Sequence, residues 1–211
     1  MIVKTLIRFF IAVALLGPAV VPSLGAPLKG VVLGDSLVAG YQLGPGEAFP
    51  ERLEAALKAA GHDIVIANAG VSGDTTSGGL ARLDWSVPDD TAFVILELGA
   101  NDALRGVPPE DTRRNLDTMV ARLTARGIDV ILVGMLAPPN MGDDYAAKFN
   151  PIYPDLAEKY GVPLYPFFLD GVATHADLQL ADGMHPNPQG VEEMVKRFLP
   201  LIETYLSDRA A

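Results

Sequence analysis

The sequence predicts a single α/β domain with three layers, in which helices cover both faces of a five-stranded parallel sheet. Two observations lead to this prediction. Short runs rich in Val, Ile and Leu recur along the chain, and stretches with helical periodicity separate them. Near-continuous apolar strands that alternate with helices are typical of parallel sheets covered on both faces. Residues 26–211 contain no linker, repeat or low-complexity segment, so we expect them to form one domain.

Five segments have the composition of buried strands. In chain order they are residues 29–33, 64–67, 93–98, 129–133 and 162–165. The last contains Pro163, which lacks a backbone donor, and this predicts a position at an edge of the sheet. Ligands of open parallel sheets bind beyond the carboxyl ends of the strands, so the residues that follow each segment are the candidates for chemistry.

Three long helices are predicted from apolar residues that recur every three or four positions. The first covers residues 50–60 and stops at Gly61, and the second opens at Pro108 and Pro109 and closes at Gly127. The third runs from Pro188 to about residue 207. Its apolar stripe consists of Val191, Met194, Val195, Phe198, Leu199 and Ile202.

Residues 1–25 have the pattern of a secretory signal peptide. Lys4 and Arg8 precede an apolar run, and Ser23 and Gly25 offer the small side chains that a cleavage site requires. We expect a mature chain from Ala26, with cleavage after Ala26 as the alternative. A membrane anchor is disfavoured, because the apolar run is short for a span of about 20 residues and a Gly-Pro pair interrupts it. We therefore expect the protein to be exported, to the periplasm or the medium, and to have no stable membrane anchor.

Composition excludes several classes of chemistry and partner. The chain has no cysteine, so it forms no disulfide, has no thiolate nucleophile and offers no Cys-based metal site. Its formal net charge of −10 argues against nucleic acid, whose recognition needs basic surfaces.

A candidate nucleophile follows the first predicted strand, in Gly34-Asp35-Ser36-Leu37. A serine at a strand-to-helix turn points its hydroxyl out of the sheet and leaves its own amide free at a helix N-terminus. Acyl transfer uses both groups, the hydroxyl for attack and the amide for the oxyanion. Serine and aspartate are also ordinary helix caps, so this motif alone does not decide the role of Ser36.

A candidate base lies near the C-terminus, where Asp182 precedes His185 by three residues. A carboxylate at this spacing can hold Nδ1–H of the imidazole while Nε2 faces the serine, and this fixes the tautomer that a general base requires. His62 follows a helix end and resembles a solvated turn residue. His175 has no comparable local arrangement, so it is the reserve candidate.

Two further clusters offer hydrogen-bond donors at strand ends. Gly73 follows the second strand and presents an unshielded backbone amide, and Asn101 follows the third strand and presents a carboxamide N–H. Either donor suits an oxyanion hole. The ordinary alternatives are a Gly-rich turn capped by Ser72 or Asp74, and a helix cap formed by Asn101 or Asp102.

Together these clusters resemble the SGNH, or GDSL-type, hydrolase family. The matching blocks are Gly34-Asp35-Ser36-Leu37, Gly73 within residues 68–75, Gly99-Ala100-Asn101-Asp102, and Asp182-Gly183-Met184-His185. Their order and approximate spacing also agree, so the resemblance covers nearly all of residues 26–211. It implies a flavodoxin-like sheet and a serine esterase that forms an acyl-serine intermediate on small-molecule esters. It implies no metal or organic cofactor.

Within that family, the chain is similar to the exported bacterial thioesterase I/lysophospholipase/arylesterase group. The similarity includes residues 101–106, where Ala103 replaces a glycine of that group. It implies carboxylic esters as substrates, with thioesters as a further candidate. Candidate substrate-binding residues follow the third and fourth strands, and they are Leu104, Arg105, Met135, Leu136 and Pro138.

Two alternatives to this function remain at this stage. One is a carbohydrate O-deacetylase with the same fold, which would act only on the shortest acyl groups. The other is a non-catalytic flavodoxin-like binding module that holds a phosphate at the helix after Ser36. Asp35, the acidity of the chain and the Asp182–His185 pair count against the second alternative.

Overall fold

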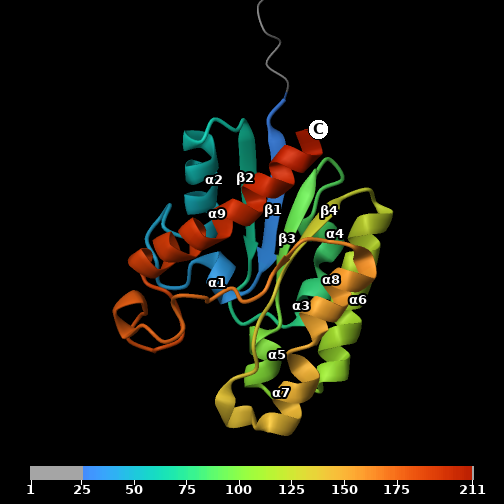
Figure 1. Ribbon diagram of the computed structural model, residues 1–211, viewed down its shortest axis with the longest axis vertical. Coiled ribbons are helices and arrows are strands. Elements are labelled where there is room, and N and C mark those ends of the chain that lie inside the picture. The colour runs from blue at the N-terminus through green and yellow to red at the C-terminus, as the bar shows by residue number, and fades with distance from the viewer. Residues whose placement is uncertain (1–25, 211) are drawn as a thin grey trace, which may run out of the picture.

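Figure 1 shows the computed structural model, which describes residues 26–210. The predicted signal peptide, residues 1–25, therefore lies outside the described residues. Within residues 26–210, none of the helices combines the length and the apolar composition that crossing a membrane requires.

The five strands form one parallel sheet in the order β2-β1-β3-β4-β5. They are β1 (Leu28–Gly34), β2 (Ile64–Gly70), β3 (Phe93–Glu97), β4 (Asp129–Val133) and β5 (Leu164–Tyr165). This strand order is the flavodoxin-like one, so the predicted fold class is confirmed. The edge position predicted for the last strand is also confirmed, and β5 begins only after Pro163.

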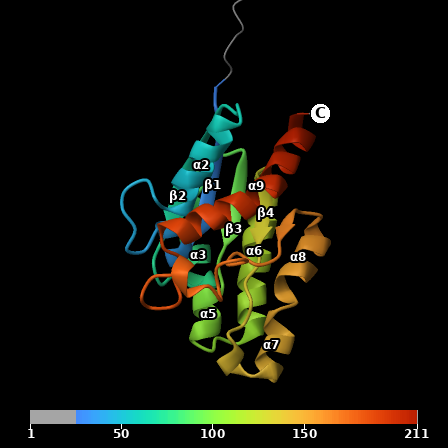
Figure 2. The ribbon, with the colours of Figure 1, turned by 60° about the vertical axis from the view of Figure 1, so that its left-hand side comes forward.

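Helices cover both faces of the sheet, as Figures 1 and 2 show. On one face, α2 (Phe49–Ala59) packs against α9 (Pro188–Ala210). The other face carries α3 (Thr76–Ala81), α4 (Leu83–Ser86), α6 (Pro109–Ala125) and α8 (Ile152–Tyr160). Right-handed crossovers between parallel strands produce this arrangement. The chain adds β2 on one side of β1 and the later strands on the other, and this reversal places the crossover helices on opposite faces.

On the face of α2 and α9, aromatic contacts join α2 to α9 and to the segment that follows β5. Phe49 is fully buried, and its ring meets the rings of Phe168 and Phe198 edge to face, at centroid distances of 4.8 and 5.5 Å. The neighbouring strands β1 and β3 contribute Val32 and Ile95, which are paired in register and also fully buried. This continuous core makes the sheet a rigid base for the loops at its ends.

Several short helices were not predicted from the sequence. They are α3, α4, α5 (Ala100–Leu104), α7 (Asp143–Phe149) and α8. The pair Gly78-Gly79 weakens the helical signal of α3, and Pro154 weakens that of α8. In addition, β2 continues to Gly70 rather than to residue 67, because Gly70 pairs with Gly34 at the end of β1. The last helix reaches Ala210 although it contains Pro200.

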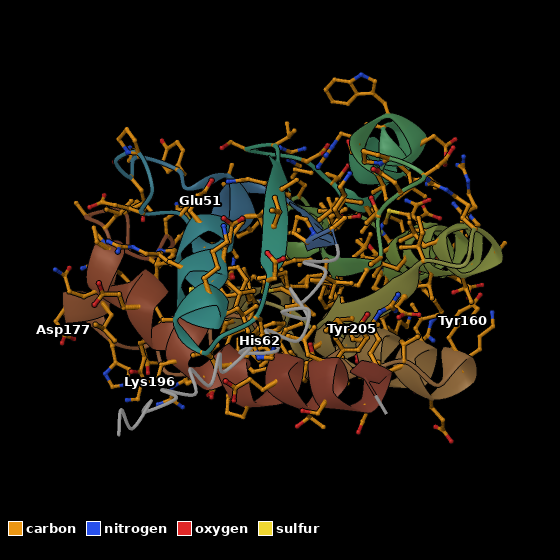
Figure 3. The ribbon with its side chains drawn as sticks, turned by 90° about the horizontal axis from the view of Figure 1, so that it is seen from above. Glu51, His62, Tyr160, Asp177, Lys196 and Tyr205 are labelled. Atoms are coloured by element: carbon orange, nitrogen blue, oxygen red, sulfur yellow. The ribbon has the colours of Figure 1, made fainter. Side chains whose placement is uncertain are left out.

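The carboxyl ends of the strands lie at the lower end of the sheet in Figure 1, near α1 (Ser36–Ala39), α5 and the segment that leads into α9. Figure 3 views the molecule from the opposite end of the sheet, where the strands begin. His62 and Tyr205 are labelled there, on the side where β1 and β2 begin. The polar clusters that follow β1, β2 and β3 in the sequence therefore lie together at the carboxyl ends of the strands.

Candidate active site

Ser36 is the first residue of α1 and lies two positions after Gly34, the last residue of β1. Asp35 caps this short helix, and its Oδ1 accepts a hydrogen bond from the Leu37 backbone N–H at 3.0 Å. The capping role that the sequence left open for either residue therefore belongs to Asp35. The Ser36 hydroxyl makes a different contact, with His185.

A chain of hydrogen bonds links Ser36, His185 and Asp182. The Ser36 Oγ lies 2.8 Å from His185 Nε2, and His185 Nδ1 lies 2.7 Å from Asp182 Oδ2. Asp182 Oδ1 also accepts the backbone N–H groups of His185 and Met184, at 3.0 and 2.9 Å. These backbone N–H groups, together with the His185 ring, lower the pKa of Asp182 to about 2. The carboxylate is therefore ionised at neutral pH and accepts the Nδ1 proton of His185.

The other two histidines lie away from Ser36. His62 precedes β2, at the opposite edge of the sheet, where it lines a separate small hollow. His175 is exposed and precedes a 3₁₀ turn, Ala176–Leu178. His185 is thus the histidine that the fold brings to Ser36.

Gly73 and Asn101 lie beside Ser36, Gly73 on the loop that follows β2 and Asn101 in α5, the helix that follows β3. Gly73 has a φ of +80°, which a residue with a side chain rarely adopts. The Asn101 Nδ2 donates to Asp35 Oδ2 at 2.9 Å, so one amide hydrogen is bound, and the other has no acceptor among residues 26–210. Neither alternative cap exists at these positions, since Thr75 caps α3 and Gly99 precedes α5 without a side-chain cap.

These residues share one cavity of about 780 Å³ at the carboxyl ends of the strands. Four predicted substrate-binding residues line it, and they are Leu104, Met135, Leu136 and Pro138. The fifth, Arg105, does not line the cavity; its Nη2 donates to the Gly73 carbonyl oxygen at 2.8 Å. Most of the remaining wall is apolar, which suits the hydrocarbon part of a ligand. Within residues 26–210, no cluster of His, Asp and Glu residues is arranged to hold a metal ion.

Tyr41 is a residue of this site that the sequence did not indicate. Its ring lies 4.6 Å from that of His185, centroid to centroid, and it lines the same cavity. Tyr41 follows α1 in a loop without a recognisable motif, so only the folded chain reveals the contact.

Two buried acids, Asp35 and Glu97, lie beneath Ser36, and no sequence motif indicates their contact. Glu97, at the end of β3, is 1 % exposed, and its Oε2 accepts the Asp35 backbone N–H at 3.2 Å. Its other oxygen, Oε1, is buried without a hydrogen-bond partner among residues 26–210. Burial raises the pKa of both carboxyl groups, and it raises that of Glu97 well above its usual range, with the adjacent Asp35 carboxyl as a second, smaller cause. Burial and the adjacent Asp35 carboxyl therefore both favour the protonated form of Glu97.

This raised pKa predicts how the stability of a Glu97→Gln variant depends on pH. A group whose pKa is higher in the folded state stabilises the fold at low pH, and it loses this contribution as the pH rises toward the folded value. Glutamine resembles the protonated acid and does not titrate. The free energy of unfolding of Glu97→Gln should therefore increase relative to the wild type between pH 5 and pH 9, as urea titrations would measure.

Glu54→Gln is the matched control, because its pKa shift has the opposite sign. Glu54 accepts the Ile66 N–H and the Lys58 ammonium group, which lower its pKa. Relative to the wild type, this control should lose stability as the pH rises through the acid range. Stability curves of Glu97→Gln and wild type that stay parallel from pH 5 to pH 9 would contradict a protonated Glu97.

A three-layer α/β/α fold whose parallel strands carry hydrogen-bonded Ser, His and Asp side chains at their carboxyl ends defines a serine hydrolase. The chain belongs to the GDSL-like lipase/acylhydrolase family, which residues 32–192 match, and it is an ester hydrolase. The predicted resemblance is thereby confirmed, and the hydrolase is favoured over the non-catalytic binding module.

Curated relatives match most of the chain. It is 44 % identical over 165 residues to an arylesterase of Vibrio mimicus, covering 76 % of this chain and 81 % of the relative. It is 36 % identical over 177 residues to esterase TesA of Pseudomonas aeruginosa, covering 83 % of this chain and 88 % of that esterase. The thioesterase 1/protease 1/lysophospholipase L1 of Escherichia coli is also 36 % identical over 177 residues, with 82 % of this chain and 84 % of the relative covered.

Solved structures show the same fold. The SGNH-hydrolase family esterase AlinE4 has 46 % sequence identity and a TM-score of 0.73, covering 87 % of this chain and 99 % of its own. The esterase EstA of Pseudoalteromonas, in a structure inhibited by monoethylphosphonate, has 32 % identity and a TM-score of 0.80, covering 85 % and 98 %.

Proposed function

We propose that Ser36 is the nucleophile of this ester hydrolase, that His185 is its general base and that Asp182 orients and stabilises His185. The observation that carries the proposal is the unbroken chain of hydrogen bonds from Ser36 Oγ through His185 to Asp182 Oδ2, at 2.8 and 2.7 Å. Both distances lie within the range over which a base can take the proton of a nucleophile.

In the first step, the Ser36 Oγ attacks the ester carbonyl carbon while its proton moves to His185 Nε2. The tetrahedral intermediate collapses when the bond to the leaving oxygen breaks, and His185 returns the proton to that oxygen. A water molecule then attacks the acyl-serine, again giving its proton to His185. The second intermediate releases the carboxylic acid, and the proton on His185 returns to Ser36.

Three donors are proposed to bind the oxyanion. They are the backbone N–H groups of Ser36 and Gly73 and the free amide hydrogen of Asn101. Asp35 supports the last role, because its carboxylate accepts the other amide hydrogen and so turns Nδ2 toward the site. Removing one such donor typically lowers kcat by about 10²–10³-fold.

We propose that the natural substrate is a carboxylic ester with an apolar acyl group, as for an arylesterase, thioesterase or lysophospholipase. Leu104 and Leu136 support this assignment, since both line the cavity beside Ser36 and are 54 % and 46 % exposed. Exposed apolar side chains in a cavity leave surface that an acyl chain can cover. The signal-like residues 1–25 support export to the periplasm or the medium.

A hydrolysis series over p-nitrophenyl esters from acetyl to palmitoyl tests this substrate class. We expect kcat/KM to rise beyond the acetyl ester. A thioester, a lysophospholipid and an acetylated sugar, assayed beside the series, would identify the leaving group. Activity restricted to the acetyl ester and the acetylated sugar would instead indicate a carbohydrate O-deacetylase.

Leu136→Ser should lower kcat/KM for an octanoyl ester more than for an acetyl ester, by about 3–10-fold, because it removes apolar contact with the longer chain. Val65→Ser is the matched control. Val65 is 43 % exposed but lies on the edge strand β2, outside the cavity, so its replacement should leave both rates unchanged. Equal losses for the two esters in Leu136→Ser would place the acyl chain elsewhere.

A further inference from the structure

Arg82 connects three separate segments beneath the candidate active site. It lies between α3 and α4, and its side chain is 15 % exposed. Its guanidinium donates four hydrogen bonds. They are from Nε to Asp74 Oδ2 at 2.7 Å, from Nη1 to Ala69 O at 2.9 Å and to Ser86 Oγ at 3.0 Å, and from Nη2 to Gly34 O at 2.9 Å.

Three of these acceptors belong to segments that carry the site. Gly34 is the last residue of β1, two positions before Ser36, and Ala69 is the last residue but one of β2. Asp74 directly follows Gly73. One planar group therefore fixes the end of the strand that presents Ser36 relative to the loop that presents Gly73, because its donors have a rigid geometry.

The loop is built around the Arg82–Asp74 pair. Gly78 faces the Asp74 carboxylate so closely that an added Cβ would lie 1.8 Å from Oδ1 and would displace the carboxylate from this position. The loop also folds onto β1 through the Val71 N–H, which donates to Gly34 O at 3.0 Å. Gly34 O thus accepts from the loop backbone and from Arg82 at once, and this joins the two parts of the proposed oxyanion hole.

We propose that Arg82 is a positioning residue for acyl transfer: it sets the distance between the Ser36 hydroxyl and the Gly73 N–H. This inference rests on the proposed function. Arg105 also contacts this loop, at Gly73 O. Arg105 is exposed, however, and exposed charged contacts contribute little to the stability of a structure. Arg82 is mostly buried and is paired with a carboxylate that is 13 % exposed, so its contacts are the stronger constraint.

Loss of the guanidinium would leave Asp74 without its cation and would free the loop to move. Oxyanion donors act only within about 2.7–3.1 Å of the oxygen, and a misplacement of about 1 Å can lower the rate roughly 10²-fold. Part of the cavity wall consists of residues that follow β4, and these residues make no hydrogen bond with Arg82. Loss of Arg82 should therefore change KM less than kcat.

The test compares Arg82→Met, Arg82→Lys and Arg126→Met in p-nitrophenyl ester hydrolysis. Arg82→Met keeps the apolar stem and removes every donor, so kcat should fall about 10–100-fold while KM stays within about 3-fold. Arg82→Lys keeps a charge beside Asp74 but has a single nitrogen, so it should remain at least about 5-fold impaired. Arg126→Met is the control, because Arg126 is 22 % exposed and donates to Val87 O and Asp89, away from the cavity.

Several results would overturn the inference. They are a kcat within about 3-fold of wild type in folded Arg82→Met, full activity in Arg82→Lys, or an equal loss in Arg126→Met. If Arg82→Met fails to fold, Asp74→Asn replaces it. That variant should lose kcat about 3–10-fold with KM unchanged, and a normal kcat would overturn the inference. Ser36→Ala, assayed in parallel, separates the two claims: turnover by Ser36→Ala refutes the proposed function, whereas an inactive Ser36→Ala beside a fully active Arg82→Met refutes only the role of Arg82.

Discussion

Replacement of Ser36 by alanine is expected to lower kcat for ester hydrolysis by about 10⁴–10⁶-fold, since it removes the proposed nucleophile. The fold should persist, because the Ser36 side chain contacts His185 rather than the core. We expect the free energy of unfolding to change by less than about 1 kcal/mol. Steady-state kinetics and urea unfolding of the same preparation measure the two quantities.

Ser72→Ala is the matched control for Ser36→Ala. Ser72 lines the same cavity but lies on the exposed loop after β2, next to Gly73. Its replacement should leave kcat within about 3-fold of the wild-type value, because its exposed side chain makes no hydrogen bond with Ser36, His185 or Asn101. Retained turnover by folded Ser36→Ala, or an equal loss in Ser72→Ala, would contradict the role assigned to Ser36.

Asp182→Asn is expected to lower kcat by about 10³–10⁴-fold with little change in KM. Asparagine keeps the size of the side chain but presents an amide hydrogen to His185 Nδ1. This favours the imidazole tautomer with its proton on Nε2, which cannot accept the Ser36 proton. The loss should therefore appear in the acylation step, measured as the burst of p-nitrophenol release.

Asp177→Asn controls for a change of charge near the same loop. Asp177 lies in the exposed 3₁₀ turn before the site and is at the periphery of the molecule in Figure 3. This variant should keep kcat within about 2-fold, because surface charges are screened by solvent. A loss of less than 10-fold in Asp182→Asn would show that His185 does not depend on this carboxylate.

The sheet and the proposed catalytic groups could be predicted because their signals are local. Each strand is a short apolar run, and Asp182 and His185 are only three residues apart on one loop. The parallel sheet then brings the carboxyl ends of β1, β2 and β3 together, and with them Ser36, Gly73 and Asn101. Short helices such as α7 and α8 were missed because their periodic pattern spans only about two to two and a half turns of helix.

The supporting contacts could not be predicted, because they depend on the three-dimensional packing of distant segments. Arg82 is 48 residues from Gly34, and Asn101 is 66 residues from Asp35. In the sequence, Arg82 looks like an ordinary charge at the end of a short helix. Glu97 is a similar case, since a glutamate at the end of a strand gives no sign of complete burial.

Labelling with a p-nitrophenyl alkylphosphonate, followed by peptide mass spectrometry, tests the central claim most directly. Such a reagent reacts with an activated serine and leaves a stable adduct that resembles the tetrahedral intermediate. We expect one adduct per chain, on the peptide that contains Ser36, together with loss of ester hydrolysis in proportion to labelling. Complete inactivation with the adduct on another residue, or full labelling of Ser36 without loss of activity, would contradict Ser36 as the nucleophile.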